Sequence, residues 1–153
     1  MLRISGIKEG SLVDGEGVRM TFFLTGCLHN CAGCHNPEFQ DFSNGKDIEI
    51  DKLIRKIERN RKLIDGITLS GGDPMFQYIQ VLEFLKVIRS NEKLKNLNIW
   101  LYTGFRFKQT GDDIKELVDV IVDGKYIHSL ANKEWAGSAN QKIWKKNKEG
   151  VWK

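Results

Sequence analysis

The feature that most constrains this 153-residue chain is a group of three cysteines, Cys27, Cys31 and Cys34, which are all the cysteines it contains. Thiolates this close in sequence usually share a metal, because a common cation stabilises negative charges that would otherwise repel. Structural zinc sites and electron-transfer iron–sulfur clusters normally take four protein ligands. Three cysteines at C-x3-C-x2-C spacing therefore favour an iron–sulfur cluster with one iron left open for another ligand.

Other interpretations of the cysteines stay open at this point. Cysteine can pack like a small hydrophobic side chain, but a polar loop that contains glycine is a poor place for a core. A zinc site completed by His29 or His35 is the stronger alternative, although no second pair of ligands follows at the spacing of common zinc modules. Disulfides are not expected, because the number of cysteines is odd and residues 1–6 do not resemble a signal peptide.

The composition predicts one globular domain spanning residues 1–153. Hydrophobic residues make up 41% and charged residues 29% of the chain, and no run of about 18 apolar residues could cross a membrane. We therefore expect a cytoplasmic protein with no membrane partner. Much of the net charge of +4 lies in residues 142–153, which hold five lysines and one glutamate.

The lysine-rich tail also contains Trp144 and Trp152, and it allows three interpretations. Lysine interleaved with tryptophan could bind nucleic acid by charge and stacking. The tail could instead be a docking surface for a protein. We favour the third interpretation, a solvated segment whose tryptophans pack back on the core, and do not expect nucleic acid as a partner.

Hydrophobic patterning predicts alternating strands and helices. Short apolar runs predict strands at 20–25, 66–70, 98–103 and 120–122, and helical spacing predicts helices at 51–64, 77–90 and 112–117, the first capped by Asp51. Repeated βα units with continuous apolar strands are typical of an α/β fold with a parallel sheet and right-handed crossovers.

Each predicted strand ends in a glycine-containing or polar motif: the cysteine loop, Gly71-Gly72-Asp73-Pro74, Gly104, and Asp123-Gly124. Active sites of parallel α/β folds lie at this carboxyl edge of the sheet. Four units are too few for a closed eight-stranded barrel. We therefore expect a partial, open parallel (β/α) barrel, whose wide mouth suits a macromolecular substrate.

These motifs, in this order, resemble those of the radical S-adenosylmethionine enzymes, and among them the glycyl-radical enzyme activases. The similarity covers about Gly6 to Gln141 and includes Asp14-Gly15-Glu16-Gly17-Val18-Arg19 and Cys31-Ala32-Gly33-Cys34-His35-Asn36. The later motifs Tyr102-Thr103-Gly104, Asp123-Gly124-Lys125-Tyr126 and Gly137-Ser138-Ala139-Asn140-Gln141 resemble those of the short activases that act on anaerobic ribonucleotide reductase. Gly33 stands where most radical S-adenosylmethionine enzymes have an aromatic residue, and Glu16 where relatives often have proline.

The resemblance implies a radical mechanism with two cofactors. Cys27, Cys31 and Cys34 would hold three irons of a 4Fe–4S cluster, and the amino and carboxylate groups of S-adenosyl-L-methionine would chelate the fourth. One electron passed to the sulfonium would break the sulfur–C5′ bond and give methionine and a 5′-deoxyadenosyl radical. The cofactor supplies this chemistry and the protein supplies position and electrostatics, so no general acid–base pair is expected.

The same scheme implies residues that bind S-adenosylmethionine. The main chain at Gly33, Cys34 and His35 would line the adenine, and the carbonyls of Gly71 and Gly72 would accept from the methionine ammonium. Asp73 would add a carboxylate opposite that ammonium, cap the helix after Pro74, or do both. Weaker candidates for ligand contact, or for a purely structural role, are Tyr102, Asn140 and Gln141. Arg19 is a weaker candidate for contact with a carboxylate of a ligand or partner.

The implied substrate is the Cα–H of one glycine in the large glycyl-radical subunit of anaerobic ribonucleoside-triphosphate reductase. The implied electron donor is a flavodoxin-like reductant, under oxygen-free conditions. Two alternatives remain: a short radical S-adenosylmethionine enzyme acting on a small molecule, and a non-enzymatic metal- or nucleic-acid-binding module.

Overall fold

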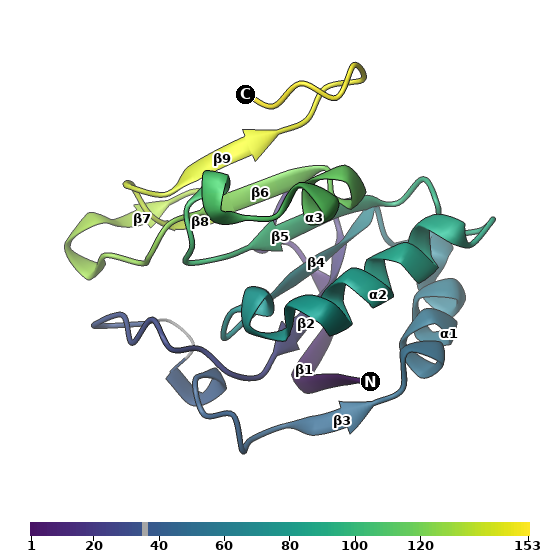
Figure 1. The fold of residues 1–153 in the computed structure, drawn as a ribbon, viewed down its shortest axis with the longest axis horizontal. Helices are drawn as coiled ribbons and strands as arrows, with labels where there is room; N and C mark the ends of the chain where they lie inside the picture. The colour runs from purple at the N-terminus through teal and green to yellow at the C-terminus, as the bar shows by residue number, and fades with distance from the viewer. Residues whose placement is uncertain (35–36) are drawn as a thin grey trace.

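The structure is a computed structural model that describes residues 1–34 and 37–153 (Figure 1). The predicted cofactor residue His35 lies outside the described residues. A seven-stranded sheet with strand order β3-β1-β2-β4-β5-β6-β9 forms the centre of the fold. The sheet is open: β3 and β9 form its two edges, and it does not close into a barrel.

The four predicted strands are present and lie side by side. They are β2 (Arg19–Leu24), β4 (Gly66–Gly71), β5 (Asn98–Tyr102) and β6 (Val120–Asp123), and each neighbouring pair is parallel. The α/β class and the parallel centre of the sheet are thus confirmed. Their carboxyl ends meet at one edge, as expected for parallel strands joined by helical crossovers.

The prediction of a wholly parallel sheet is wrong at its edges. β1 (Leu2–Ser11) pairs antiparallel with both β2 and β3 (Lys46–Ile48), and β9 (Lys142–Lys145) pairs antiparallel with β6. A separate hairpin consists of β7 (Ala131–Lys133) and β8 (Ala136–Ser138). These outer antiparallel strands carry charged residues or glycine, as β1 does, so the continuous apolar pattern that marks the central parallel strands is missing from them.

The three predicted helices are also present, and all pack on the same face of the sheet (Figure 1). They are α1 (Ile50–Asn60), α2 (Tyr78–Ser90) and α3 (Asp112–Leu117), supplemented by short 3-10 turns at Pro37–Phe39, Arg61–Leu63, Pro74–Gln77, Phe107–Gln109 and His128–Leu130. The assignment of Asp51 as the cap of α1 is wrong. The N-cap is Glu49, whose side chain makes no capping bond, and Asp51 lies in the first turn, where its charge complements the helix dipole.

The core lies between this sheet face and the helices. Strand residues such as Phe22, Leu69 and Leu101 alternate with side chains on the other face, and they pack against Phe84 and Ile88 of α2. The helix-covered face is therefore closed by hydrophobic burial. The opposite face carries buried polar side chains, such as Arg19 and Thr21, beside a second, smaller hydrophobic cluster that includes Trp100 and Val122.

That opposite face holds a buried arginine. Arg19 is 1% exposed, and its guanidinium donates to the carbonyls of Glu16, Ile67 and Asn98 and to the hydroxyl of Thr68. Burial lowers the pKa of Arg19 to about 10, so the group stays charged at neutral pH. Arg19 therefore joins β2, β4 and β5 at their amino ends and does not meet a ligand carboxylate.

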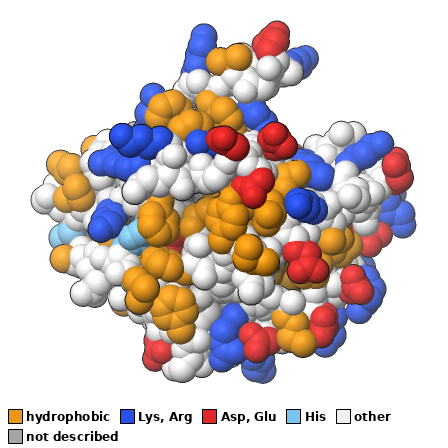
Figure 2. Space-filling view, in the orientation of Figure 1, with side chains coloured by type: hydrophobic (Ala, Val, Ile, Leu, Met, Phe, Trp, Pro, Cys, Tyr) orange, Lys and Arg blue, Asp and Glu red, His pale blue; other side chains and the backbone are white. Residues whose placement is uncertain are grey.

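The C-terminal segment packs on the fold, as favoured from the sequence. Trp144 of β9 stacks on Phe107 at a ring separation of 4.3 Å, and Trp152 meets the same ring edge-on. In Figure 2 this segment projects at the top of the molecule, with charged side chains at its tip and hydrophobic side chains at its base. The tail therefore covers the β6 edge of the sheet.

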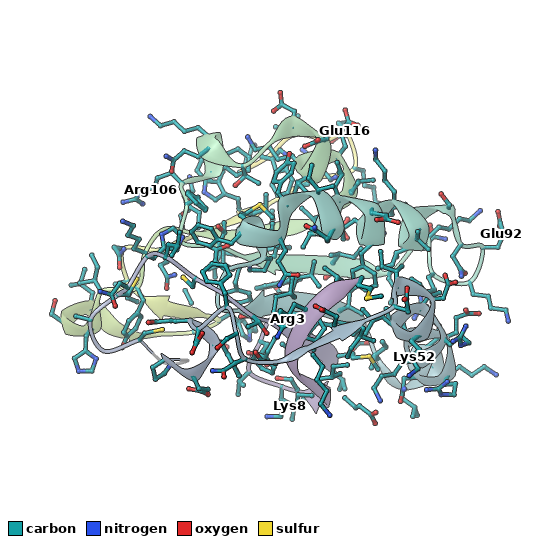
Figure 3. All side chains as sticks on the ribbon, turned by 60° about the horizontal axis from the view of Figure 1, so that its bottom comes forward. Arg3, Lys8, Lys52, Glu92, Arg106 and Glu116 are labelled. Carbon is teal, nitrogen blue, oxygen red and sulfur yellow. The ribbon has the colours of Figure 1, made fainter. Side chains whose placement is uncertain are left out.

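The two ends of the parallel strands lie at opposite ends of the molecule. In Figure 3, Arg106, which follows the carboxyl end of β5, is far from Glu92, which lies in the turn between α2 and β5. Within the residues described, no helix combines the length and apolar character needed to cross a membrane.

We predict that Arg19→Met destabilises the fold by about 3 kcal/mol, because it removes the charged donor from several buried acceptors at once. Urea denaturation of the metal-free protein measures this loss. Arg55→Met, on the exposed side of α1, is the matched control and should change stability by less than about 0.5 kcal/mol. Equal stability of the two variants would contradict a structural role for Arg19.

Candidate functional site

A cavity of about 730 Å³ lies on the face of the sheet that the helices leave open, at the carboxyl ends of the parallel strands. Its volume is within the roughly 300–1,000 Å³ typical of small-molecule sites. The predicted site residues that line it are Cys27, Cys31, Cys34, Gly71, Gly72 and Tyr102. Two more predicted residues, Gly33 and Asp73, are the sequence neighbours of Cys34 and Gly72, which line the cavity.

The cysteine loop leaves the end of β2 and is held by main-chain hydrogen bonds. The N–H of Gly26 donates to the carbonyl of Phe39, and the N–H of Cys27 donates to that of Gln40. A turn in which Cys34 N–H donates to Cys31 O brings the second and third cysteines together. Asn30 has φ of +52°, in the left-handed region that asparagine adopts more readily than most residues. The C-x3-C-x2-C segment therefore forms a folded loop that is held by hydrogen bonds.

The three thiols face the cavity and form no disulfide. Burial raises the pKa of the Cys27 thiol to about 11, with the nearby carboxylate of Asp73 contributing, while a hydrogen bond from the main-chain N–H of His29 opposes the shift. Cys27 is therefore protonated at neutral pH in the metal-free protein. A bound cation would reverse this, because metal ligation favours the thiolate and releases the proton.

The two kinds of metal site that the cysteines allow differ in the separation of the sulfurs that they require. Within the described part of the chain, no three His, Cys, Asp or Glu side chains are placed to share one metal. Tetrahedral zinc, with Zn–S bonds of about 2.3 Å, requires its sulfurs within about 4 Å of one another. A 4Fe–4S cluster spreads its cysteines over different irons and needs them further apart. In addition, Nε2 of His29 is bound to Asp73 and is not available to complete a zinc site.

The end of β4 comes into main-chain contact with the cysteine loop at Gly72. The N–H of Gly72 donates to Leu24 O, and the N–H of Asp73 donates to Gly26 O. A Cβ at position 72 would lie 2.4 Å from Gly26 O and 2.6 Å from Phe39 O, so only glycine fits here. The Gly-Gly pair therefore has a packing role beside any role in ligand binding.

Gly33 makes room for a histidine from a distant segment. It has φ of +70°, and a Cβ there would lie 2.8 Å from Cγ of His128. His128 Nδ1 is in turn hydrogen-bonded to the hydroxyl of Tyr126, which lines the cavity. The ring of His128 thus lies against the position where most radical S-adenosylmethionine enzymes carry an aromatic side chain.

Asp73 is a buried carboxylate with four donors. Its Oδ1 accepts from the N–H of Met75, so Asp73 caps the turn that precedes α2, as one of the two predicted roles requires. Its Oδ2 accepts from His29 Nε2 at 2.6 Å, the Gly104 N–H at 2.8 Å and the Thr103 hydroxyl at 3.0 Å. At 1% exposure, the carboxylate does not line the cavity.

The remaining candidates from the sequence have structural partners. Tyr102 donates its hydroxyl to the carbonyl of Trp135, and burial raises its pKa, so the phenol stays neutral. Asn140 donates to the carbonyl of Lys125, and Gln141 donates to that of Gly124. The amide pair therefore fixes the turn after β8 to the end of β6, in agreement with the turn interpretation.

Sequence reasoning missed one wall of the cavity and the partner of Asp73. Leu12, Val13 and Asp14, which precede β2, line the cavity together with Trp135 of the β7–β8 hairpin. His29 was considered only as a zinc ligand, and its bond to Asp73 spans 44 residues of sequence. Nothing in the local sequence pattern around His29 identifies that partner.

Comparison with known proteins agrees with this geometry. The family described as "4Fe-4S single cluster domain" matches residues 13–144, a range that includes all three cysteines and the glycine motifs. Three curated relatives are each called "Anaerobic ribonucleoside-triphosphate reductase-activating protein". The one from Enterobacteria phage T4 is 40% identical over 150 residues, covering 92% of each chain.

The other two relatives come from bacteria. The protein of Vibrio cholerae is 38% identical over 141 residues, covering 86% of this chain and 90% of its own. That of Escherichia coli K12 is 33% identical over 142 residues, covering 86% and 91%. The chain therefore belongs to the family of anaerobic ribonucleoside-triphosphate reductase-activating proteins, and its residues 13–144 match the 4Fe–4S single cluster domain.

Proposed function

We propose that this chain is a radical S-adenosylmethionine activase that generates a glycyl radical on anaerobic ribonucleoside-triphosphate reductase. The observation that carries the proposal is the meeting of three cysteines and a glycine-rich strand end at one open cavity, in a member of this activating family. Residues 1–153 would act as one cytoplasmic domain. Its open sheet would correspond to the partial parallel (β/α) barrel of radical S-adenosylmethionine enzymes.

Cys27, Cys31 and Cys34 would hold a 4Fe–4S cluster with one iron left for S-adenosylmethionine. When bound and reduced, the cluster supplies the electron that splits S-adenosylmethionine into methionine and a 5′-deoxyadenosyl radical. The protein contributes three thiolates from a half-buried loop, whose main chain is held by hydrogen bonds to the carbonyls of Phe39 and Gln40. Hydrogen bonds to the sulfurs and limited solvent exposure both tune the potential of such a cluster.

The end of β4 would bind the methionine part. Gly71 and Gly72 line the cavity beside the thiols, and their lack of side chains leaves the main chain open to a ligand ammonium. The carboxylate of Asp73 directly follows them, but it is committed to four donors. We propose that Asp73 favours the ammonium through its charge in a buried setting, without direct contact.

The other side of the cavity would hold the nucleoside. The main chain at Gly33 and Cys34, continuing into His35 outside the described residues, would lie along the adenine. Tyr102 lines the same cavity with its hydroxyl fixed to Trp135, so its ring can border the ribose or the methionine. This assignment places both halves of S-adenosylmethionine in one space of about 730 Å³.

The proposed substrate is a glycine Cα–H in the large subunit of the reductase. Loss of this hydrogen atom to the adenosyl group of bound S-adenosylmethionine would leave a glycyl radical on the partner and give 5′-deoxyadenosine. The names of the relatives support the partner, and a cavity on a sheet face without covering helices supports a macromolecular substrate. A flavodoxin-like protein would supply the electron.

We expect the anaerobically reconstituted, reduced protein to give a 4Fe–4S electron paramagnetic resonance signal that changes when S-adenosylmethionine is added. Mixing with the reductase subunit and S-adenosylmethionine should then give a glycyl-radical signal and 5′-deoxyadenosine. Cys27→Ala, Cys31→Ala and Cys34→Ala should each abolish cofactor cleavage, because each removes a ligand, while the circular dichroism of the fold is largely kept.

Three outcomes would contradict the proposal in different ways. Uptake of zinc and no iron would indicate a structural metal module. A cluster whose signal ignores S-adenosylmethionine would remove the radical mechanism. Cofactor cleavage without a radical on the reductase would indicate a small-molecule substrate. A cysteine variant with normal cleavage would remove that residue from the ligand set.

We further predict that Gly33→Ala lowers the stability of the metal-free protein by about 1–2 kcal/mol and weakens binding of S-adenosylmethionine. The alanine must adopt a left-handed conformation, and its Cβ meets the ring of His128. Thermal or urea denaturation gives the stability, and calorimetric titration of the reconstituted protein gives the affinity.

The control for this prediction is Gly10→Ala in β1, because a Cβ there meets nothing within 4 Å and its φ is not positive. The double variant Gly33→Ala, His128→Ala should recover the share of the loss that comes from the ring contact and keep the share from the left-handed backbone. If Gly33→Ala is as stable as Gly10→Ala, close packing at Gly33 does not occur.

A further inference from the structure

A loop that lies across the open face of the sheet forms one wall of the cavity. It runs from Leu12 to Gly17, between β1 and β2, and is anchored at Asp14. The carboxylate of Asp14 accepts from the Thr21 hydroxyl at 3.1 Å, and its carbonyl accepts from the Thr68 hydroxyl at 2.8 Å. Thr21 and Thr68 pair midway along β2 and β4, so the loop is fixed over the middle of these strands.

This anchoring leaves two apolar side chains exposed at the cavity. Leu12 and Val13 both line it, and they are 69% and 68% exposed. Single exposed apolar residues are common on protein surfaces, but apolar residues gathered at one site mark a place where a partner binds. Packing of the core therefore does not account for Leu12 and Val13.

Trp135, in the turn between β7 and β8, extends the same wall. Its ring meets that of Trp100 edge to face at 5.9 Å between centroids, and its carbonyl accepts from the Tyr102 hydroxyl. Gly15 of the Leu12–Gly17 loop lies against the same Trp100 ring, where an added Cβ would be 2.8 Å from Cδ2. Trp100 thus supports both parts of the wall.

The backbone of Trp135 has a conformation that tryptophan rarely adopts. Its φ is +58°, in the left-handed region that glycine and asparagine favour. Strain of this kind at a bulky residue points to a function of its side chain. Because Trp135 lines the cavity, we expect that function at this wall.

The wall is displaced from the cysteines along the strand direction. The three cysteines follow the carboxyl end of β2, whereas the Leu12–Gly17 loop is fixed over the middle of the strands. The charged residues Lys8 and Glu134 line the same space. An apolar centre with a polar rim is the usual composition of a surface that binds another protein.

We infer that Leu12, Val13 and Trp135 form a docking wall for the protein substrate and pack against the segment that carries its reactive glycine. This rests on the proposed function, in which that segment belongs to the large subunit of the reductase. Glycine has no side chain, so such a segment is held through its main chain and its neighbouring residues. An apolar wall suits a segment in which apolar residues flank the glycine.

The test measures binding of the full, anaerobically reconstituted chain to the large reductase subunit by calorimetry. The double variant Leu12→Ser, Val13→Ser should bind at least about 10-fold more weakly, because two apolar side chains lose their contacts. The matched control is the double variant Leu63→Ser, Ile79→Ser, which changes two residues of similar exposure, 72% and 70%, in the Arg61–Leu63 turn and in α2. This control should bind like the unsubstituted chain.

Two further variants test Trp135. Trp135→Asn keeps a residue that tolerates the left-handed turn but removes the ring, and it should weaken binding by about 10-fold. Trp135→Phe keeps an aromatic ring and should retain more of the affinity. In assays of radical formation, Trp135→Asn should lower the rate at low reductase concentration more than the rate at saturation.

A photoreactive benzoylphenylalanine at position 12 locates the docked segment. Irradiation of the complex should give a cross-link in the reductase peptide that contains the reactive glycine, identified by mass spectrometry. The same group at position 63 should give no cross-link in that peptide. Cross-links from position 12 that are confined to other regions of the subunit overturn the inference.

Other outcomes separate this inference from the proposed function. If the unsubstituted chain binds the subunit and generates the radical, but Leu12→Ser, Val13→Ser binds equally well or no worse than the control, the docking wall is wrong and the proposed function stands. Loss of self-association in that variant, with reductase binding unchanged, indicates a second copy as the occupant and also overturns the inference. Binding through the wall without radical formation contradicts the proposed function alone. If the unsubstituted chain does not bind the subunit, both fail.

Discussion

The site depends on the parallel pairing of β2 with β4. In their register Leu24 pairs with Gly71, so the two strands end side by side at the same edge of the sheet. The cysteine loop and the glycine pair then continue side by side, linked by the bond from Asp73 N–H to Gly26 O. Because a Cβ at Gly72 would collide with the carbonyl oxygens of Gly26 and Phe39, the two main chains can lie this close only with glycine there. The thiols and the glycine carbonyls are thus neighbours before any ligand binds.

The same alternation that builds the core places a second set of side chains on the other sheet face, polar in β2 and apolar in β5 and β6. In β2, Met20 and Phe22 face the helices, while Arg19 and Thr21 lie on the opposite face. A buried guanidinium is costly unless it is fully hydrogen-bonded, and Arg19 meets this condition by using carbonyls from three strands or loops. The amino ends of the strands are thereby closed by a structural network, and the open cavity is confined to the carboxyl ends.

The sequence predicted those parts of the structure that have local signals. Continuous apolar runs identified β2, β4, β5 and β6, and helical spacing identified α1, α2 and α3. The cysteines and glycines at the strand ends identified the cavity edge, because topology alone brings such ends together.

Contacts between distant residues could not be predicted in the same way. Antiparallel β1 and β9 depend on pairing with strands already formed, and their own charged and aromatic residues do not indicate it. The bond between His29 and Asp73 and the contact of His128 with Gly33 join residues separated by 44 and 95 positions. Arg19 was a weak candidate for contact with a carboxylate of a ligand or partner, because the sequence does not show that its side chain is buried among main-chain carbonyls. In each case, the partner is set by the fold and has no signature near the residue itself.

The metal-free loop shows how cluster binding and protein structure are coupled. The pKa of Cys27 is raised to about 11 by burial, so at neutral pH the thiol must lose a proton when it ligates iron. That loss becomes easier as the pH rises, and iron binding is therefore favoured at higher pH within the range where the fold is stable. Burial of the loop therefore couples cluster uptake to proton release, because the same desolvation that keeps Cys27 protonated in the metal-free protein is overcome only when a cation pairs with the thiolate.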